Sequence, residues 1–533
     1  MLFSILLLLA PAYAADNVTE RHEMIPMRDG ARLSTYLYIP QGNGPWPVLY
    51  EQRYANLRGE AQRKRYSSLA AHGYVVAAQN FRGTHESEGV YQGYRALGWG
   101  KLQDGYDTVE WLAKQKWSTG KIGTFGGSQA GYAQNFLAVT QPPHLVAQYI
   151  IDGGLSLFHL GYRLGGVTRI ERFKEGMLGD ARDPAEGRRH LEDQIAHPNY
   201  DAWWQQEDCT LHFPKMNVPT FTIASWFDFM SRGSIDTYLG RNSRGGPNAR
   251  GKQWLLIGPW LHGGQKSNPK VAEMQFPPNA AFDMDTHMIQ WFDFHLKGKP
   301  TGVDRAPKVR YYTMGENQWH EAADWPPAAK PVSYYLASDG ALAAAKPNTS
   351  KSSTEFIADP ANPAPSPGRG EPTARDGRAF EAHKDVRVFT SKPLQSPVEW
   401  TGLVQAELFI SSDAPDTDVI VRVSDVYPDG RSILLLDAPR RAKYRDSFEK
   451  PSLLEKGRVY KIAFDLGYLS QVFAPGHRIR IAVSGTMSDY FEPNPNTGET
   501  PTYEKPRNTR IAHNHVHHEA SFASRILAPV RTK

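Results

Sequence analysis

Short apolar runs and amphipathic stretches alternate over the first quarter of the chain. Residues 32–39 alternate between apolar and polar side chains as a half-buried strand does, whereas residues 47–50 and 73–79 are continuously apolar, which is typical of buried strands. Residues 104–114 then show apolar positions at helical spacing, and residues 121–125 form a further strand-like run. Strands that alternate with helices in this order predict an α/β fold with a mainly parallel sheet.

The next part of the chain interrupts this alternation. Residues 153–217 are rich in Arg, Glu and His, show helical spacing and lack β-branched runs, which indicates an inserted helical cap. Strand-like runs return at 219–225 and 253–257, so the chain is expected to re-enter the sheet there. Residues 281–297 have a helical pattern with an apolar stripe, which is expected to face the core.

Beyond about residue 331 the helical signal disappears. A loop rich in Pro, Ser and Gly is expected over residues 344–379, and the rest consists of short alternating runs separated by turn signals. This pattern is typical of an antiparallel β-sandwich, with runs at 402–410, 418–425, 432–437, 458–466 and 478–483. The predicted organisation is an α/β domain in two parts (15–152 and 218–328), a helical cap (153–217) and a C-terminal all-β domain (329–533).

Composition and charge exclude some classes of function. With 40% hydrophobic residues among 533, the chain is globular and long enough for two or three domains. Its 61 basic and 56 acidic residues are interspersed and form no basic stripe with interleaved aromatic residues, so no nucleic-acid partner is predicted. The single cysteine, Cys209, excludes an intrachain disulfide, lies in no cysteine-hydrolase signature and is expected to be an incidental thiol.

The N-terminus has the pattern of a signal peptide. An apolar run from Leu2 to Ala10 is too short to span a bilayer, and an A-x-A motif at residues 12–14 precedes a polar stretch. No Lys or Arg precedes the run, so the true start of this segment stays open. Cleavage after Ala14 would remove residues 1–14, and the sequence therefore predicts a secreted or periplasmic bacterial protein with no membrane span.

A glycine-rich turn supplies the strongest local sign of chemistry. The sequence GGSQAG, residues 126–131, directly follows a predicted strand and precedes a helix. A nucleophilic serine on such a turn needs small neighbours, and the next backbone N–H can face a developing oxyanion. Ser128 is therefore the candidate nucleophile and the Gln129 N–H a candidate oxyanion donor. The spacing G-x-S-x-x-G is moderately specific, and an ordinary serine in a glycine turn is the alternative.

A serine nucleophile needs a histidine base that a carboxylate orients. In α/β hydrolases the chain order is Ser, acid, His, with the last two residues on loops after later strands. Asp228 follows the strand-like run FTIAS, and His262 follows WLLIG. We rank Asp228 above Asp236, which is expected within a helix, and above Asp152, which is expected to shape the entry to the cap.

Motifs along nearly the whole mature chain resemble one family. This is the CocE/NonD hydrolases of the X-Pro dipeptidyl-peptidase superfamily, which includes cocaine esterase, α-amino acid ester hydrolases and cephalosporin acylases. The motifs that carry the resemblance occur in the right order and are MRDGARLSTYLYIP, QNFRGTHESEG, GGSQAG, SWFD, GPWLH, WFDFHLKG, MGENQWHEAADWPP and SRILAPV.

The resemblance implies an α/β-hydrolase domain with an inserted helical cap and a C-terminal jelly roll. It also implies a second oxyanion donor, a tyrosine hydroxyl after the second apolar strand, and Tyr54 stands at the matching place. The family usually has Tyr after the nucleophile, whereas this chain has Gln129, which keeps the backbone donor but makes the pocket wall polar. Arg82 and Glu88 are expected to hold their loop by ion pairing. The mechanism requires no cofactor.

The residues that flank the predicted triad bear on the substrate. The α-amino acid ester hydrolases carry acidic residues two and three places after the triad Asp, where this chain has Met230 and Ser231. A substrate ammonium group would find no counter-charge there. We expect Phe229, Met230, Trp260 and Leu261 to line the acyl pocket, which favours a neutral, partly aromatic substrate. An ester is expected rather than an amide, because an ester leaving group asks less of the general acid.

Several alternatives stay open at this point. Within the enzyme class, the alternative is an amidase or acylase, or a dipeptidyl-peptidase-type activity on acyl-amino compounds. Outside it, the jelly roll could bind a glycan or a surface. Strand alternation puts His513, His515 and His517 on one face, but no cysteine completes a metal site and none is predicted. A small-molecule ester or amide is the expected partner, and a homo-oligomer is left open.

Overall fold

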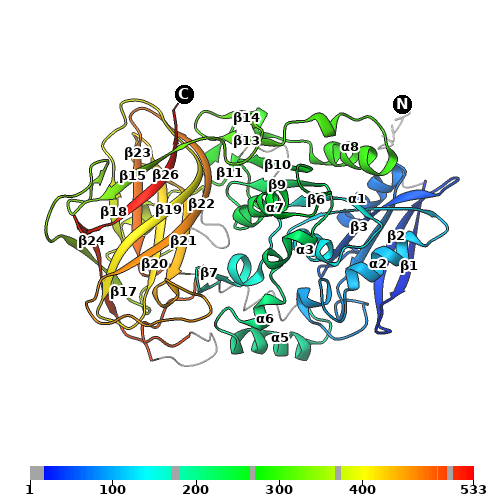
Figure 1. The fold of residues 1–533 in the computed structure, drawn as a ribbon, viewed down its shortest axis with the longest axis horizontal. Coiled ribbons are helices and arrows are strands. Elements are labelled where there is room, and N and C mark those ends of the chain that lie inside the picture. Colours follow the sequence, from blue (N-terminus) through cyan, green and yellow to red (C-terminus); the bar gives the residue numbers. More distant parts are fainter. Residues whose placement is uncertain are drawn as a thin grey trace, which may run out of the picture.

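The computed structural model describes residues 17–169, 180–263, 270–366, 374–488, 490–500 and 508–532 of the 533-residue chain. The predicted signal peptide, residues 1–14, lies outside them. Figure 1 shows an α/β domain on the right, an all-β domain on the left and the cap helices below and between them.

A ten-stranded sheet forms the centre of the α/β domain, in the order β1-β2-β4-β3-β5-β6-β9-β10-β13-β14. From β4 to β13 neighbouring strands are parallel, and antiparallel strands close both edges. The strands are β1 (Val18–Pro26), β2 (Arg32–Pro40), β3 (Trp46–Arg53), β4 (Val75–Asn80), β5 (Ser118–Gly127), β6 (Leu145–Ile151), β9 (Thr220–Ser225), β10 (Gln253–Gly258), β13 (Val309–Thr313) and β14 (Gln318–Ala322).

Helices cover both faces of this sheet. α1 (Glu60–Ala71) and α8 (Met284–Lys297) bury Tyr66, Leu69, Met288 and Trp291 in one apolar cluster, and α2 (Asp104–Ala113) and α3 (Gln129–Thr140) bury Val109, Leu112 and Leu137 in another. α7 (Ser231–Arg244) packs on β9 and β10. Short helices join these elements at η1 (Gly93–Ala96), η4 (Pro278–Ala280) and η5 (Val303–Arg305), and β11 (Lys270–Val271) pairs with β12 (Met274–Gln275). The α/β prediction is confirmed.

The cap segment is mainly helical but not wholly so. Its described elements are η2 (Phe158–Tyr162), β7 (Arg163–Leu164), β8 (Val167–Thr168), α5 (Pro184–Ala196), α6 (Ala202–Gln205) and η3 (Cys209–Lys215). The side chain of Asp183 caps α5 by accepting a hydrogen bond from the Ala185 N–H at 2.9 Å, as a residue before a helix beginning with Pro commonly does. Cys209 is fully buried in an apolar cluster, in agreement with an unreactive thiol.

The C-terminal domain is a sandwich of an eight-stranded and a four-stranded sheet. The larger sheet contains β15 (Lys330–Leu336), β16 (Leu342–Ala343), β17 (Ser353–Ala358), β19 (Val398–Ser412), β22 (Tyr460–Phe473), β24 (Ala512–Glu519), β25 (Phe522–Ala523) and β26 (Arg525–Arg531). The smaller contains β18 (Arg387–Thr390), β20 (Asp418–Val426), β21 (Ser432–Arg441) and β23 (Arg478–Ser484), and the short helices α9 (Arg378–Glu381) and η6 (Ala442–Tyr444) lie in its connections.

The two large domains share one apolar core. Trp226 and Phe227, which follow β9, belong to the same buried cluster as Val404 and Leu466 of the sandwich. A backbone bridge between Met314 and Gln471 joins the domains directly. Because this interface is buried and apolar, side chains of the sandwich take fixed positions beside the loops of the α/β sheet.

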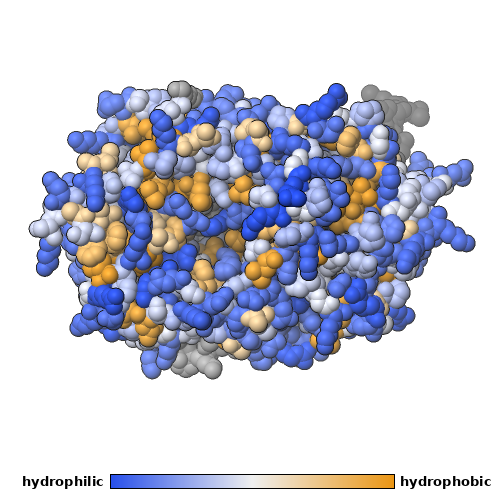
Figure 2. Space-filling view, viewed as in Figure 1, coloured by the Kyte–Doolittle hydropathy of each residue, from blue (hydrophilic) through white to orange (hydrophobic). Residues whose placement is uncertain are grey.

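One face of the molecule and the lengths of the described helices bear on contacts with a membrane. Figure 2 shows a mostly hydrophilic face with hydrophobic side chains in small groups. No helix in the described ranges is long and apolar enough to cross a membrane.

The histidine-rich strand β24 alternates as the sequence predicts. His513 is exposed and contacts Glu355 at 2.9 Å, while His517 contacts the Ser411 hydroxyl at 2.9 Å. His518, which points to the opposite side, is buried and contacts Thr354 at 2.8 Å. One ring nitrogen of each of these three imidazoles thus contacts a group on a neighbouring strand.

Candidate active site

Ser128 occupies the sharp turn between β5 and α3. Its backbone has φ 58° and ψ −118°, a conformation that costs a residue with a side chain on the order of 1–3 kcal/mol. The Ser128 N–H points to the carbonyl oxygens of Ile151 at 3.0 Å and Asp152 at 3.2 Å, and its carbonyl accepts from the Tyr132 N–H at 3.0 Å. The neighbouring strand end therefore holds the strained turn in place.

The glycines of the turn are required by close packing. A Cβ on Gly126, which has φ 125°, would lie 2.5 Å from Glu51 Oε1 and 2.7 Å from the Ala130 side chain. A Cβ on Gly131 would lie 2.8 Å from the Gly153 Cα. These contacts explain why small residues surround Ser128 in the sequence motif.

Asp228 and His262 meet beyond the ends of the neighbouring strands β9 and β10. His262 Nδ1 lies 3.0 Å from Asp228 Oδ1, and the Asp228 side chain is fully buried. Backbone hydrogen bonds join the two loops, because the Trp226 N–H donates to the Gly258 carbonyl at 2.8 Å. Parallel strands thus bring together two residues that are 34 positions apart in the chain.

Asp236, the lower-ranked acid, lies within α7 as expected. Its carboxylate pairs with Arg232 at 3.4 Å and accepts the Tyr468 hydroxyl at 3.0 Å. Burial raises its pKa, with Arg232 acting in the opposite direction. Asp236 therefore belongs to a contact between α7 and the sandwich.

Asp152 makes contacts that its expected place at the entry to the cap does not suggest. It is buried, has φ 44°, and accepts hydrogen bonds on Oδ2 from the Gly263 N–H at 2.9 Å and the Ser225 hydroxyl at 3.2 Å. Its carbonyl receives the Ser128 N–H. Asp152 thus links the nucleophile turn to the residue after His262, and the sequence analysis missed this link.

Among the described residues, the side chains of Asp152, Asp228 and His262 lie close enough together to be considered as metal ligands. Ligand atoms of Asp152, Asp228 and His262 lie within 4.8 Å of one another. However, Asp152 Oδ2 already accepts two protein hydrogen bonds, and His262 Nδ1 faces Asp228. Their chemistry fits an oriented imidazole better than a metal cage.

Tyr54 and Gln129 are joined by a contact that the sequence does not predict. Gln129 Oε1 accepts hydrogen bonds from the backbone N–H groups of Tyr54 at 2.8 Å and Ala55 at 3.0 Å. The Tyr54 ring packs edge-on against Phe81 and Tyr94. The Gln129 side chain therefore fixes the loop after β3 to the start of α3. Because Gln129 is the first residue of this helix, its backbone N–H has no acceptor within the helix.

We predict that Gln129→Leu lowers kcat by about tenfold while leaving the fold intact. Leucine keeps the backbone N–H of residue 129 but leaves the Tyr54 and Ala55 N–H groups without their acceptor, which shifts the loop after β3; a misplacement of about 1 Å can cost up to 100-fold. Steady-state kinetics on a neutral aryl ester check this. Gln129→Glu, which restores an acceptor oxygen, should recover most of the activity; equal rates in the leucine variant and the wild type would contradict the prediction.

The four predicted pocket residues separate into two groups. Phe229 lines a cavity and stacks on the His262 ring, with ring centroids 4.9 Å apart. Met230 is 3% exposed and packs in the apolar cluster of the cap. Trp260 turns back over Gly258 into the α/β core, where its Nε1–H donates to the Ala280 carbonyl at 2.9 Å, and Leu261 packs on the shared domain core. None of these last three residues lines the cavity described below, and the Trp260 ring lies in the core; a place for Met230 and Leu261 in the acyl pocket stays a prediction.

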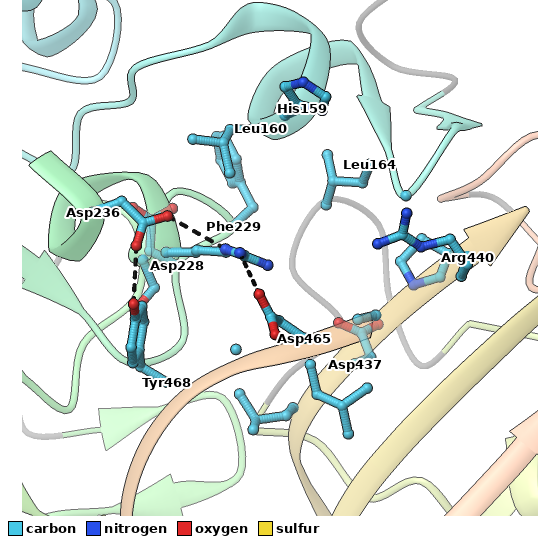
Figure 3. Close-up of a pocket in the computed structure, with 18 of the residues that line it drawn as sticks. His159, Leu160, Leu164, Asp228, Phe229, Asp236, Asp437, Arg440, Asp465 and Tyr468 are labelled. Atoms are coloured by element: carbon cyan, nitrogen blue, oxygen red, sulfur yellow. Dashed lines mark hydrogen bonds and ion pairs between the residues drawn. The ribbon is translucent and has the colours of Figure 1, made fainter. Parts of the chain in front are cut away.

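A cavity of about 360 Å³ adjoins the site. All three parts of the chain contribute to it: Asp228 and Phe229 from the α/β domain, His159 and Leu160 from the cap, and residues of β21 and β22 from the sandwich (Figure 3). Its volume suits a small organic group. Burial lowers the pKa of His159 to about 4, so this side chain is neutral at pH 7. Sequence reasoning missed the cap and sandwich residues, because nothing in their local pattern marks them.

Comparisons with known proteins agree with this architecture. The X-Pro dipeptidyl-peptidase (S15 family) model matches residues 29–264, and the model of the X-Pro dipeptidyl-peptidase C-terminal non-catalytic domain matches residues 301–527. The chain is 30% identical to cocaine esterase of Rhodococcus sp. over 95% of its own length and 97% of that protein. It belongs to the CocE/NonD hydrolases of the X-Pro dipeptidyl-peptidase superfamily.

Solved structures extend the likeness to the whole fold of this CocE/NonD hydrolase. An aminopeptidase from a marine sediment Thaumarchaeota archaeon is 25% identical with a TM-score of 0.86, and each chain is covered to 97%. An α-amino acid ester hydrolase is 23% identical with a TM-score of 0.84 and 98% coverage of both chains, which shows the shared fold. As a member of this family the protein is a serine hydrolase, and the predicted jelly roll corresponds to its C-terminal domain.

Proposed function

We propose that this CocE/NonD hydrolase cleaves carboxylic esters through an acyl-enzyme on Ser128. In this scheme His262 removes the Ser128 proton as the hydroxyl attacks the ester carbonyl, and then donates it to the leaving alcohol. Water, deprotonated by the same imidazole, releases the acid and restores Ser128. The 3.0 Å contact between His262 Nδ1 and Asp228 Oδ1, beside the strained Ser128 turn, carries the proposal.

The oxyanion that forms in each step would be stabilised by two donors. We assign these to the Gln129 N–H at the start of α3 and the Tyr54 hydroxyl. The Gln129 side chain supports the assignment, because it joins the two elements that carry the donors. Such donors act on charge that develops in the transition state, so they increase kcat.

We predict that Tyr54→Phe lowers kcat about 100-fold and leaves KM nearly unchanged. Phenylalanine keeps the edge-on contacts with Phe81 and Tyr94 but removes one oxyanion donor, a loss of about 3 kcal/mol. Kinetics on a neutral aryl ester check this. Tyr94→Phe is the matched control, because it removes a hydroxyl from the neighbouring ring and should change kcat less than about threefold. A fall confined to KM would contradict the oxyanion role.

Neutral substrates fit the site better than substrates with a free α-amine. The positions that would hold an ammonium group carry Met230, which is buried, and Ser231, which lines the cavity without a charge. The aminopeptidase of the same fold keeps an amidase activity open as the alternative. The two activities are distinguished by the rates on a neutral ester, its matched anilide and a free-amine dipeptide ester. If the anilide is hydrolysed as fast as the ester, the protein is an amidase and the esterase proposal is wrong.

We further propose that the protein acts outside the cytoplasm. The apolar run and A-x-A motif of residues 1–14 support export. Sequencing the N-terminus of the protein recovered from the periplasm or the medium should give Ala15 first. An uncleaved Met1 in the cytoplasmic fraction would overturn this proposal.

A further inference from the structure

The cavity beside Asp228 contains a cation that the proposed mechanism does not use. Arg440 of β21 lines this cavity, on the side opposite Asp228 in the view of Figure 3. No group in the described ranges accepts a hydrogen bond from the Arg440 guanidinium, and its Nε is buried. Its near contact is the Phe448 ring, 4.6 Å from Cζ. A half-buried guanidinium that has an aromatic neighbour but no anion is short of one partner.

The carboxylates of the cavity have other partners. Arg232 forms ion pairs with Asp465 at 2.6 Å and with Asp236 at 3.4 Å (Figure 3). Asp437 lies 4.0 Å from Arg422, which approaches from the neighbouring strand β20. Burial raises the pKa of Asp437, whose buried Oδ2 accepts no hydrogen bond from the described residues. Asp228 is engaged with His262, and no carboxylate that lines the cavity lies within ion-pair distance of Arg440 in the described ranges.

Arg440 keeps its charge in this position. Burial, together with repulsion from Arg232, lowers the pKa of Arg440 to about 10, and Asp465 acts in the opposite direction. The guanidinium therefore stays protonated at pH 7. A buried cation without a hydrogen-bonded anion costs free energy that a bound anion would recover.

Besides the charged side chains of Arg232, Asp236 and Asp465, the cavity wall has an apolar part. Leu160 and Leu164 of the cap, Leu436 of β21 and Phe229 beside His262 supply it. Such a cavity accepts a hydrocarbon or aromatic group along its length and a planar anion at its end. A carboxylate matches the guanidinium because both are planar and can form two parallel hydrogen bonds.

We propose that this cavity binds the acyl part of the substrate and that Arg440 binds a carboxylate at the distal end of that acyl group. The substrate class is then a half-ester of a dicarboxylic acid. This inference rests on the proposed ester hydrolysis and changes the expectation of a neutral acyl group. The uncharged side chains of Met230 and Ser231 are compatible with it, although Asp236, Asp437 and Asp465 also line the cavity.

The test compares a charged ester with its capped counterpart. Mono-4-nitrophenyl terephthalate carries a rigid distal carboxylate, and 4-nitrophenyl methyl terephthalate is the same molecule without the charge. The wild type should favour the charged ester in kcat/KM by about tenfold or more, and Arg440→Gln should lower kcat/KM for it by about 10- to 100-fold. The capped ester should change less than about threefold, which also shows that the variant folds. Arg440→Lys should give an intermediate value.

The control variant is Arg458→Gln, which removes an exposed arginine that pairs with Glu455 and should alter neither ester. Equal losses on both esters in Arg440→Gln, or a wild type that favours the capped ester, would overturn the carboxylate site while leaving ester hydrolysis in place. If neither ester is hydrolysed, the proposed function fails instead. Calorimetry with monomethyl terephthalate on Ser128→Ala then decides the anion site: binding at least tenfold weaker in Ser128→Ala/Arg440→Gln supports it, and equal binding excludes it.

Discussion

Replacement of Ser128 by alanine should lower kcat on a neutral aryl ester by about 10⁶-fold, because the variant has no atom that can carry the acyl group. The residual rate would come from the oxyanion donors and from binding alone. KM should change little, since the cavity wall is untouched. Steady-state kinetics with 4-nitrophenyl butyrate measure the loss. Alanine has the same backbone strain as serine at φ 58°, so the turn should keep its geometry.

A covalent probe separates the loss of a nucleophile from the loss of the fold. A fluorophosphonate should add its phosphonyl group to the wild type once per chain, and peptide mass spectrometry should place it on Ser128. Ser128→Ala should take up none, whereas Ser243→Ala, which removes an exposed hydroxyl on α7, should be labelled as fast as the wild type. Labelling of Ser128→Ala at another serine would contradict the assignment of the nucleophile.

The triad candidates could be predicted from sequence because each of them directly follows a predicted strand of a parallel sheet. Buried parallel strands read as apolar runs, and the residues just after them collect at one sheet edge. The runs before Ser128, Asp228 and His262 were clear in the sequence, so their side chains could be expected to meet. The structure places Asp228 and His262 in contact. The resemblance to a family then added Tyr54, which no local pattern marks.

Side-chain direction was the part that sequence could not supply. Trp260 stands two places before His262, yet its ring folds back over Gly258 into the core, because the missing Cβ leaves space there. Asp104 is the first residue of α2, where an aspartate can cap the helix, but its carboxylate instead accepts hydrogen bonds from the buried Arg82 guanidinium. For Asp104, a partner 22 positions away in the chain thus decided the outcome over the local propensity.

Contacts between domains could not be predicted from the sequence either. Leu164 of the cap and Arg440 of the sandwich line one cavity although they lie in different domains. Neither shows a motif, and only the docking of the sandwich on the α/β core brings them beside Asp228. Thus the proposed reacting groups lie at strand ends that sequence can locate, whereas the groups that would select the substrate depend on tertiary packing.

Asp228→Asn should lower kcat by about 10⁴-fold while changing the structure very little. The carboxylate accepts from His262 Nδ1 at 3.0 Å, which leaves Nε2 unprotonated and able to take the Ser128 proton. An asparagine that turns its amide N–H₂ toward His262 would favour the opposite tautomer, with the proton on Nε2, and it could not stabilise the imidazolium that forms in the transition state. Because the Asp228 side chain is fully buried, solvent cannot supply the missing acceptor.

The pH profile distinguishes this electrostatic loss from a structural one. With an amide at residue 228 the imidazole loses its counter-charge, so the acidic limb of kcat/KM should move to lower pH than in the wild type. Asp429→Asn, which removes an exposed carboxylate paired with Arg431, should keep the wild-type rate and profile. A loss below about tenfold in Asp228→Asn would place the orienting role on Asp152, whose carboxylate lies in the same group of side chains. The variant therefore decides which of the two buried carboxylates orients His262.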